Sequence, residues 1–586
     1  MEQYYTNEKN VQILISLLKQ HGIKRIIVSP GSTNVTFVGS VQQDSYFELF
    51  SCIDERSAAY MACGMAAETC EPVALSCTGA TAARNYFSAL TEAYYRKLPV
   101  LAITSSQDLS RLSHLIPQVT DRSRQPVDTV KMSVLLQNVK DTEDEWDCMI
   151  KVNRALLELR HHGGGPVHIN LCTSYSPAFD IKELPKARKI ERICYEDEFP
   201  EIKAKKIAIY AGSHKRWASY EIELIDRFCA AHNVVVFVDQ TSNYTGKYRV
   251  VSSIVSGQQS PSLNCSPDLL IHMGDMSDLL GSVVCPKEVW RVSEDGEICD
   301  PYKALTYVFE MSEKHFFEHY NKNNIKGDDS YYQSCVNDFS RLMRNLPELP
   351  FSHLWVASQL HKMFPKHSTI HLGILSPLRS WNFFELDKSV EVYCNQGGFG
   401  IDGNMSSLIG ASIVSPNKIF FGIVGDLSFF YDMNSLGNRH VGNNVRILLV
   451  NNSLGAEFLL YKQRNSIYVN DVQAYISAGG HNGNQSPTLV KGFSEALGFE
   501  YMTASTKEDF KKIAKRFTMP ESNDKPMIFE VFVDAENEND ALYQIKHIEH
   551  SVTTNAKTLV KNVFRGGGLQ VQDIKYQISK EQFNKK

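Results

Sequence analysis

One stretch of the sequence decides how the fold is read, residues 419–428: Ile-Phe-Phe-Gly-Ile-Val-Gly-Asp-Leu-Ser. Its first six residues are apolar or small, which is typical of a strand buried in a parallel sheet. The cluster that follows without a gap consists of Gly425, Asp426, Leu427 and Ser428. A cluster with polar groups directly after such a strand lies at its carboxyl end, where open α/β sheets bind their ligands.

A second apolar run, 447–450, ends in a similar way, in Asn451 and Asn452. We therefore expect both clusters at the carboxyl ends of parallel strands. A carboxylate, a side-chain amide and nearby backbone carbonyls are hard oxygen ligands that suit a magnesium-type ion, which also binds phosphate oxygens. The two strand ends together predict an anchor for a diphosphate.

The residues around Asp426 support the same interpretation. Gly425 lets the backbone approach a phosphate closely, and the segment 429–436 is expected to supply a helix N-terminus that faces the anion. The alternative is an ordinary strand-end turn, in which Asp426 caps the helix and the two asparagines form a tight turn.

A second signal lies at residues 52–60, Cys-Ile-Asp-Glu-Arg-Ser-Ala-Ala-Tyr. Three adjacent charged residues, 54–56, lead into a helix rich in Ala and Met. The alternative to a functional role is helix capping, because acidic groups at a helix start interact favourably with the helix dipole.

The whole chain repeats a strand–helix–strand pattern, which predicts an α/β fold with parallel sheets. The expected strands are 25–29, 72–77 and 99–104 in a first block, 207–210, 234–238 and 269–272 in a second, and 369–372, 419–424 and 446–450 in a third. Helices are expected from Glu55 and from Thr81. We interpret the chain as three α/β domains in series.

The domains are placed at residues 1–185, 186–345 and 346–550, with a C-terminal tail at 551–586. A charged connector around 182–205 separates the first two. The tail has seven Lys or Arg against two Asp or Glu. It is interpreted as a basic solvated tail, with a functional lid as the alternative.

Composition excludes several classes of protein. Hydrophobic residues make up 43% and charged residues 22% of the chain, the balance of a soluble globular protein. A net charge of −5 argues against binding to nucleic acid or to an anionic membrane. Most of the thirteen cysteines sit singly in apolar stretches, and none forms a Cys-x-x-Cys pair, which predicts free thiols. With a polar N-terminus and no long apolar run, a cytoplasmic protein is expected.

Taken together, the motifs resemble those of thiamine-diphosphate-dependent enzymes, whose usual signature is Gly-Asp followed one strand later by Asn-Asn. Within that superfamily the chain most resembles the menaquinone-pathway 2-succinyl-5-enolpyruvyl-6-hydroxy-3-cyclohexene-1-carboxylate synthases. The motifs that carry the resemblance are Ser-Pro-Gly-Ser at 29–32, Asp-Glu-Arg-Ser-Ala-Ala at 54–59, Gly-Pro-Val-His-Ile-Asn at 165–170, Gly-Ile-Asp-Gly at 400–403 and Gly-Asp-Leu-Ser at 425–428.

The resemblance implies a fold, two cofactors and a set of roles. The first domain would bind the aminopyrimidine ring of the cofactor, the second would be the central domain, and the third would bind the diphosphate. Thiamine diphosphate and Mg²⁺ are the implied cofactors. Glu55 would hydrogen-bond the aminopyrimidine ring and favour the imino tautomer that takes the proton from the thiazolium C2. It is the implied catalytic residue.

The resemblance also implies ligand sets. Asp426, Asn452 and the Leu454 carbonyl would bind the metal. The cofactor-binding residues would be Gly425, Asp426, Leu427, Ser428, Asn452, Ile401 and Phe458, with Ile401 as the apolar wedge that bends the cofactor; the alternative for Ile401 is a plain core residue. Because Glu55 and the metal site come from different subunits in this superfamily, a homodimer or homotetramer is implied, with active sites at the interface.

The substrate site departs from the family pattern. Arginines are usual at the positions of Thr33, Gln107 and Gln396, whereas Arg379 and the family glutamine Gln118 are kept. With Ser32, these residues form the expected substrate site. Arg suits carboxylates because its planar fork binds them in a bidentate manner, so a changed substrate pair is predicted.

Two further departures lie beside these residues. Glu457 stands where the family tends to have an apolar residue next to the cofactor, unless the alignment slips by one residue. The stretch 78–81, Thr-Gly-Ala-Thr, differs from the usual Thr-Ser-Gly-Thr.

These observations predict a carboligase that decarboxylates a small-molecule 2-oxo acid and passes the acyl fragment to an acceptor. A simple decarboxylase that releases an aldehyde is a close alternative, and the menaquinone-pathway activity itself is another. A non-catalytic binding subunit is the least favoured, because Glu55, Asp426 and Asn452 are intact. The middle domain has no Gly-x-Gly-x-x-Gly loop, so neither a flavin nor a nicotinamide cofactor is supported.

Overall fold

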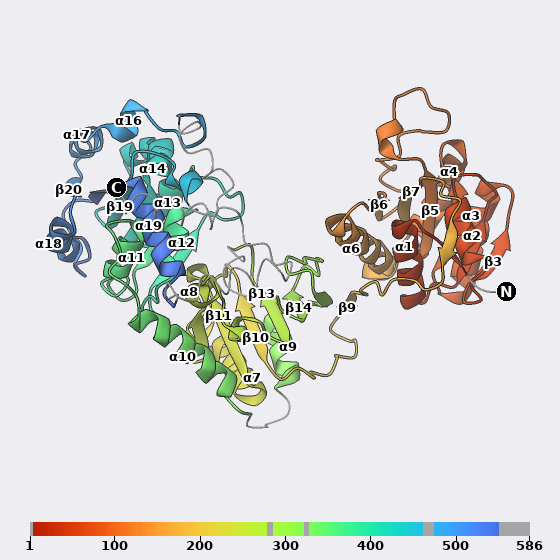
Figure 1. The fold of residues 1–586 in the computed structure, drawn as a ribbon, viewed down its shortest axis with the longest axis horizontal. Helices are drawn as coiled ribbons and strands as arrows, with labels where there is room; N and C mark the ends of the chain where they lie inside the picture. The colour runs from red at the N-terminus through yellow and green to blue at the C-terminus, as the bar shows by residue number, and fades with distance from the viewer. Residues whose placement is uncertain (1–3, 278–284, 322–326, 461–473, 550–586) are drawn as a thin grey trace, which may run out of the picture. The chain divides into compact units, whose positions relative to one another are not determined.

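The computed structural model describes residues 4–277, 285–321, 327–460 and 474–549, and its fold is α/β (Figure 1). The chain forms two compact units. The first consists of Met1–Phe199 with Glu294–Glu310, and the second of Pro200–Ser293 with Met311–Lys586. The basic tail expected at 551–586 lies outside the described residues, and the division into domains at 185, 345 and 550 stays a prediction.

The first unit is built on a six-stranded parallel sheet with the strand order β3-β2-β4-β5-β7-β6. These strands are β2 (Arg25–Val28), β3 (Glu48–Ser51), β4 (Val73–Thr78), β5 (Val100–Ser106), β6 (Met132–Leu136) and β7 (Val167–Cys172). The central strands β5 and β7 are buried along their whole length, as parallel strands covered on both faces should be.

Helices contribute to two separate cores of this unit. One core includes residues of α1 (Lys9–Gln20), α2 (Val35–Val41) and α6 (Thr142–Glu158), and the other includes α3 (Glu55–Thr69), α4 (Thr81–Asn85) and α5 (Phe87–Tyr95). The unit also contains η1 (Leu109–Arg111), η2 (His161–Gly163), an antiparallel pair of β1 (Tyr5–Thr6) with β8 (Phe179–Ile181), and a parallel pair of β9 (Glu191–Ile193) with β15 (Leu305–Glu310).

The second unit contains two parallel sheets. In the first of them Figure 1 shows β11, β10, β13 and β14 side by side, and β12 extends the order to β12-β11-β10-β13-β14. Its elements are β10 (Ile207–Ala211), α7 (Ser219–His232), β11 (Val234–Val238), η3 (Gln240–Ser242), β12 (Arg249–Val251), α8 (Ser253–Ser256), η4 (Leu263–Cys265), β13 (Leu269–Met273), β14 (Glu288–Ser293), α9 (Glu313–Tyr320) and α10 (Ser330–Arg344).

The C-terminal sheet has six parallel strands in the order β17-β16-β18-β19-β21-β20. They are β16 (Thr369–Leu372), β17 (Glu391–Cys394), β18 (Phe420–Gly425), β19 (Val445–Asn451), β20 (Glu500–Ala504) and β21 (Met527–Phe532). The helical segments are α11 (His353–Leu360), α12 (Ser376–Trp381), α13 (Asn404–Ile413), α14 (Asp426–Asp432), η6 (Met433–Gly437), η7 (Ala456–Leu459), α16 (Asn482–Gln485), α17 (Leu489–Ala496), α18 (Lys507–Phe517) and α19 (Ala535–Lys546).

Two cores flank this sheet as well. One gathers residues of α11, α12, α18 and α19, with Trp355 and Trp381 among its fully buried side chains, and the other gathers residues of α13, α14 and α17. The nine strands expected from the sequence are all present, with bounds that differ by at most two residues.

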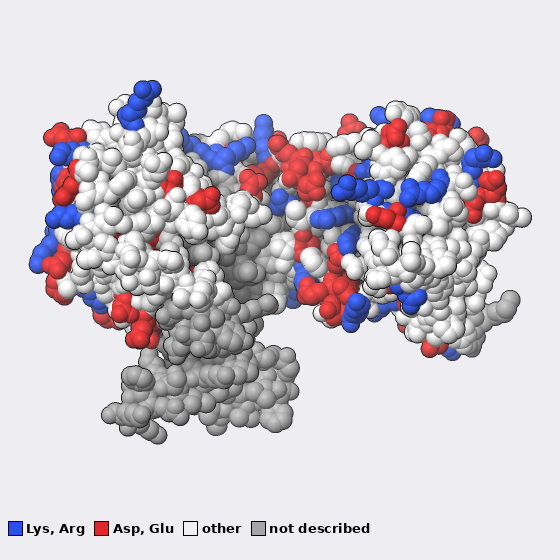
Figure 2. Space-filling view, turned by 90° about the horizontal axis from the view of Figure 1, so that it is seen from above, with Lys and Arg blue, Asp and Glu red and all other residues white. Residues whose placement is uncertain are grey.

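The distribution of charged side chains on the surface agrees with the near-balanced numbers of acidic and basic residues in the sequence. Basic and acidic side chains are intermingled over the face drawn in Figure 2 rather than separated by sign. Among the described residues no helix is long and apolar enough to cross a membrane. All thirteen cysteines are free thiols. Cys63, Cys77 and Cys229, which sit singly in apolar stretches of the sequence, are buried, whereas Cys394 is only half-buried at the end of the edge strand β17.

Candidate active site

The polar clusters predicted from the sequence lie at one edge of the C-terminal sheet. β18 and β19 are adjacent and parallel, with Gly425 opposite Val450. α14 begins at Asp426, directly after β18, and Asn451 is the last residue of β19. Asp426 is 3% exposed and Asn452 is 9% exposed. The carboxyl ends of two neighbouring strands therefore present these side chains at the same edge.

The Asp426 carboxyl group is buried. Burial raises its pKa to about 7, although the backbone N–H of Leu427 and the side chain of Asn484 favour the ionised form. Asn484 Nδ2 donates to Asp426 Oδ2 at 3.3 Å. The other amide atom, Asn484 Oδ1, is buried and accepts no hydrogen bond within the described part of the chain. A hard cation would stabilise the ionised Asp426 and use such oxygen donors, so these residues fit Mg²⁺.

Asn452 is held by its neighbours on both sides. A second buried carboxyl group, that of Glu538 on α19, interacts with the Asn452 side chain and accepts from the backbone N–H of His353 at 3.0 Å. Burial raises the pKa of Glu538 to about 8. Asn452 Oδ1 accepts weakly from Leu454 N at 3.4 Å. Groups behind a metal ligand that orient it in this way are typical of metal sites.

Leu454, the third expected metal ligand, lies in the turn after β19. Its carbonyl accepts from Ala456 N at 2.9 Å. A carbonyl oxygen has two lone pairs, so this bond leaves one of them for a cation. The half-buried Leu454 therefore remains compatible with the predicted ligand set.

The other cofactor-binding candidates lie around the start of α14. Ser428 Oγ donates to the Ile401 carbonyl at 2.6 Å, and Asn404 Nδ2 donates to the same carbonyl at 3.0 Å. Asn404 also donates to Ser428 Oγ at 2.8 Å. These bonds tie the loop of Ile401 to α14. Ile401 is half-buried, and so is Phe458 on η7.

Arg379, the arginine kept from the family pattern, is bound by Glu457. The two side chains form a pair of hydrogen bonds, Nη1 to Oε2 at 2.6 Å and Nη2 to Oε1 at 2.5 Å. Arg379 is on α12 and Glu457 is on η7, and both elements follow strands of the C-terminal sheet. The sequence marked Glu457 as a departure but did not predict this contact.

Gln396 is buried in the same unit. Its Nε2 donates to Thr241 Oγ1 at 3.0 Å, whereas its Oε1 is a buried acceptor without a partner in the described residues. An uncharged amide therefore occupies a position at which an arginine was expected from the resemblance.

Several residues near these strand ends have a strained backbone. Leu375 precedes α12 with a φ of 67°, Phe399 has 51° and Ser453 has 65°. In the first unit, Ala80 follows β4 with a φ of 57°. Positive φ is costly for residues other than glycine, and such strain gathers at functional sites. Leu375, Phe399, Ser453 and Ala80 thus place backbone strain near carboxyl strand ends of both sheets, although other loops of the chain carry positive φ as well.

Glu55 is the first residue of α3 in the first unit. The helix starts there because Asp54 accepts from Ser57 N at 2.9 Å and so caps it. Asn85 Nδ2 donates to Glu55 Oε2 at 3.3 Å. Glu55 is half-buried, and its neighbour Asp54 is the residue that performs the capping. The capping alternative therefore applies to Asp54 and leaves the Glu55 carboxylate available.

The residues of the first unit that were predicted to bind substrate lie in loops after its strands. Thr33 is buried, and its hydroxyl donates to the Ser105 carbonyl at 2.9 Å and contacts the Thr78 hydroxyl. Gln107 accepts from Arg111 Nη1 at 2.7 Å. Ser32 and Gln118 are exposed.

A buried arginine in this unit escaped the sequence analysis. Arg122 is 3% exposed, donates to Asn170, and has two donors, Nε and Nη1, that bond to no described residue. A Cβ on Gly79 would stand 2.9 Å from Arg122 Nη1, so the departure at 78–81 leaves room for the guanidinium. Nothing in the local sequence around Arg122 signals its burial.

The histidines His161 and His162 and the carboxylate of Glu310 form a group with metal-ligand chemistry in the same unit. Each histidine lies 2.9 Å from a Glu310 oxygen. Arg192 contacts Glu310 at 3.5 Å and Glu158 at 3.2 Å. The guanidinium already supplies the positive charge that a cation would bring, so a structural ion-pair network accounts for the group.

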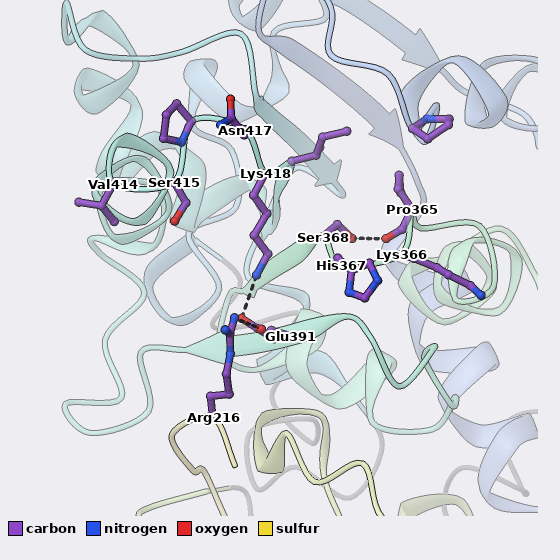
Figure 3. Close-up of a pocket in the computed structure, with 13 residues that line it drawn as sticks. Arg216, Pro365, Lys366, His367, Ser368, Glu391, Val414, Ser415, Asn417 and Lys418 are labelled. Carbon is purple, nitrogen blue, oxygen red and sulfur yellow. Dashed lines mark hydrogen bonds and ion pairs between the residues drawn. The ribbon is translucent and has the colours of Figure 1, made fainter. Parts of the chain in front are cut away.

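A pocket lies at the opposite edge of the C-terminal sheet, where its strands begin. Figure 3 shows Lys418 and Arg216 converging on Glu391, the first residue of β17. Lys418 Nζ lies 2.9 Å from Glu391 Oε2. The pocket is therefore separate from the edge that carries Asp426 and Asn452.

Comparisons with known proteins agree with the geometry. Residues 9–130 match the family model described as thiamine pyrophosphate enzyme, N-terminal TPP binding domain. The chain is 31% identical to a 2-succinyl-5-enolpyruvyl-6-hydroxy-3-cyclohexene-1-carboxylate synthase of Phocaeicola vulgatus over 93% of its own length and 99% of that protein. It is 31% identical to the enzyme of the same name from Bacteroides thetaiotaomicron, over 92% and 100%, and 27% identical to that of Christiangramia forsetii, over 91% and 97%.

Proposed function

We propose, since the chain belongs to the thiamine pyrophosphate-dependent family of the 2-succinyl-5-enolpyruvyl-6-hydroxy-3-cyclohexene-1-carboxylate synthases, that it decarboxylates a 2-oxo acid and transfers the acyl fragment to an acceptor. The family is one of carboligase-type enzymes. The observation that carries the proposal is the buried pair of Asp426 and Asn452 at the ends of two neighbouring parallel strands.

In this proposal the C-terminal sheet holds the diphosphate end of the cofactor. Asp426, Asn452 and the Leu454 carbonyl bind Mg²⁺, and Gly425, Leu427 and Ser428 line the diphosphate. Ile401 and Phe458 support the ring system. Bound thiamine diphosphate supplies the electron sink that takes up the electrons released when the 2-oxo acid loses carbon dioxide. Burial of Asp426 keeps water away from its oxygens and strengthens their attraction to the metal.

Glu55 is proposed to hold a proton at a ring nitrogen of the aminopyrimidine. Its position at the start of α3, with Asn85 as a hydrogen-bond donor and Asp54 as the helix cap, supports a carboxylate that is held in place and is not used for capping. A neighbouring donor such as Asn85 orients the carboxylate without neutralising its charge.

A homodimer or homotetramer is proposed, with Glu55 of one subunit serving the metal site of another. In support, α3 exposes Tyr60 and Met61, which are 47% and 40% exposed, and Ile53 before it is 83% exposed. Clustered exposed apolar side chains are typical of protein interfaces. The free thiols support a reducing compartment, and we propose the cytoplasm.

The donor is proposed to be smaller or less anionic than 2-oxoglutarate. Thr33, Gln107 and Gln396 offer hydrogen bonds but no positive charge at three positions where the resemblance implies arginine. Each charge-assisted hydrogen bond contributes roughly 1.5–3 kcal/mol, so their loss favours a donor such as pyruvate.

The test is to incubate the protein with thiamine diphosphate, Mg²⁺ and a panel of 2-oxo acids, and to measure release of carbon dioxide with and without aldehyde, ketone and enoate acceptors. We expect faster turnover of pyruvate than of 2-oxoglutarate, and a ligated product when an acceptor is present. An aldehyde as the sole product identifies a simple decarboxylase. Efficient turnover of 2-oxoglutarate with isochorismate contradicts the proposal and assigns the reaction of the named relatives.

A further inference from the structure

The guanidinium group of Arg379 is bound by a carboxylate of its own chain. Its two terminal nitrogens donate to the two Glu457 oxygens, at 2.6 and 2.5 Å. Two parallel N–H···O bonds of this kind are the fork with which Arg also binds carboxylate ligands. Glu457 therefore uses the donors with which Arg379 would bind a substrate carboxylate.

Both partners lie at the edge of the sheet proposed to hold the cofactor. Arg379 is on α12, which follows β16, a neighbour of β18. Glu457 is on η7 and follows Asn452 by five residues. Arg379 and Asp426 both act electrostatically on the buried Glu538, so the three charged groups share one neighbourhood. The pair stands beside the proposed metal site.

The surroundings hold the Glu457 carboxylate where it is. The side chains of Arg379 and Glu457 are 21% and 11% exposed, so water and salt screen their attraction less than on the surface. Ser376 Oγ donates to Glu457 Oε2 at 3.4 Å. A ligand carboxylate that took over Arg379 would have to break both of its hydrogen bonds to Glu457 and would stand next to this second negative group. Both effects oppose the binding of a carboxylate here.

We propose that Glu457 is a specificity-determining residue that excludes substrates with a second carboxylate at the position of Arg379. The inference rests on the proposed function for the identity of the reaction, and it names the substrate class: 2-oxo acids whose far end carries no negative charge. An apolar residue at this position would remove both of the hydrogen bonds that Glu457 makes with the guanidinium. One residue thus converts a carboxylate-binding arginine into an internally neutralised one.

The test measures binding rather than turnover. Isothermal titration without cofactor compares glutarate, a dicarboxylate probe, with butyrate, its monocarboxylate counterpart, on wild type, Glu457→Gln and Glu457→Leu. We expect both variants to bind glutarate at least about tenfold more tightly than wild type, which corresponds to about 1.4 kcal/mol. Butyrate affinity should stay within about twofold, because butyrate brings no second charge to Arg379.

Two controls locate the effect. Adding Arg379→Met to Glu457→Leu should remove the gain in glutarate affinity, because the gain requires the guanidinium. Glu391→Gln neutralises another arginine-bound glutamate of the same sheet, at its opposite edge, and should bind glutarate as wild type does. Thermal unfolding checks that each variant is folded, and if one of the two Glu457 variants does not fold, the other carries the comparison.

The outcomes separate this inference from the proposed function. Equal glutarate affinity in wild type and the Glu457 variants overturns the inference, and so does a gain that survives Arg379→Met. If pyruvate is decarboxylated but glutarate affinity does not respond to position 457, the function stands and the inference fails. If glutarate affinity responds while no 2-oxo acid is decarboxylated, the inference stands and the function fails.

Discussion

Asp426 shows how the position of one carboxyl group determines what it can bind. On the surface its pKa would lie near 4, whereas at the end of β18 burial raises it to about 7. An ionised carboxylate in such a place needs a compensating positive charge. The nearby amides of Asn452 and Asn484 contribute oxygen atoms but no charge. The proposed Mg²⁺ would supply the positive charge that these neighbours lack.

The first prediction follows from that requirement. Asp426→Ala should weaken Mg²⁺-dependent binding of thiamine diphosphate by more than about 100-fold, because replacement of groups behind a metal ligand already costs about 10–100-fold. Calorimetric titration with the cofactor and Mg²⁺ measures the loss. Asp524→Ala, which removes an exposed carboxylate of the same unit, should bind as wild type does. Wild-type affinity in the Asp426 variant would show that the metal binds elsewhere.

The second prediction concerns Glu55. Glu55→Gln keeps the size of the side chain but weakens proton exchange with the ring, so exchange of the cofactor C2 proton should slow by about 10²–10⁴-fold. Hydrogen–deuterium exchange at C2 in cofactor-loaded protein measures it. Glu68→Gln changes an exposed glutamate of the same helix and should leave the rate unchanged. Equal rates in wild type and Glu55→Gln would exclude Glu55 from cofactor activation.

At this scale, the sequence predicted which residues belong to the candidate site but not most of the side-chain contacts that they make. Asp426 and Asn452 could be predicted because each directly follows an apolar strand, and strand ends of a parallel sheet share an edge. The contact between Arg379 and Glu457 could not, because it joins side chains that are 78 residues apart in the sequence, on α12 and η7. Arg122 was missed for the same reason: its burial depends on Gly79, in a loop far from it in sequence.

At the scale of elements, a buried arginine on β19 connects this strand to the segments packed beside it. Arg446 on this strand is fully buried, and its guanidinium donates to the carbonyls of Phe517, Met519 and Glu521 at 2.6–2.8 Å. Burial lowers its pKa to about 10, so it remains a cation at neutral pH. It binds the C-terminal end of α18 and the segment after it to the strand that carries Asn451.

The third prediction is that Arg446→Met destabilises the fold by roughly 2–4 kcal/mol, because buried carbonyls lose their donors. Urea denaturation of the variant and wild type measures the change in the free energy of unfolding. Arg516→Met, on α18, removes an arginine paired with Glu500 at the surface and should cost only about 0–1 kcal/mol. Similar losses in the two variants would mean that the buried bonds of Arg446 contribute no more than a surface pair.

The strands themselves divide into those that could be predicted and those that could not. Central strands such as β5 and β19 are continuous apolar runs, because helices cover both of their faces. Edge strands were missed: β3 has one half-buried and three exposed residues, and β20 has a single fully buried one. An edge strand pairs on one side only, so its sequence carries a weaker hydrophobic pattern.

At the scale of the whole molecule, the residues predicted for the site belong to two different compact units. Glu55 belongs to the first, and Asp426 and Arg379 belong to the second. The motif order predicted this separation, because one set of residues precedes the middle sheet and the other follows it.

The fourth prediction addresses the assembly. Tyr60→Asp with Met61→Asp places two charges on the exposed face of α3, and should convert a dimer or tetramer to monomers because a buried unpaired charge is strongly unfavourable. Analytical ultracentrifugation measures the mass, and carbon dioxide release should fall with it. Leu263→Asp, at another exposed apolar position, should change neither. A monomeric wild-type protein that is fully active would contradict the shared site.

The end of α3 offers a chemical handle for following that assembly. Cys70 closes the helix in a left-handed conformation and is exposed, whereas burial raises the pKa of Cys63 on the same helix to about 11. A maleimide dye reaches the exposed Cys70 but not the buried Cys63, and the exposed Cys285 and Cys299 are replaced by Ser beforehand so that they do not react. A dye on Cys70 would lie about 22 Å along the helix axis from Glu55. Energy transfer between dyes on different copies of the chain would then report subunit exchange without altering the catalytic carboxylate.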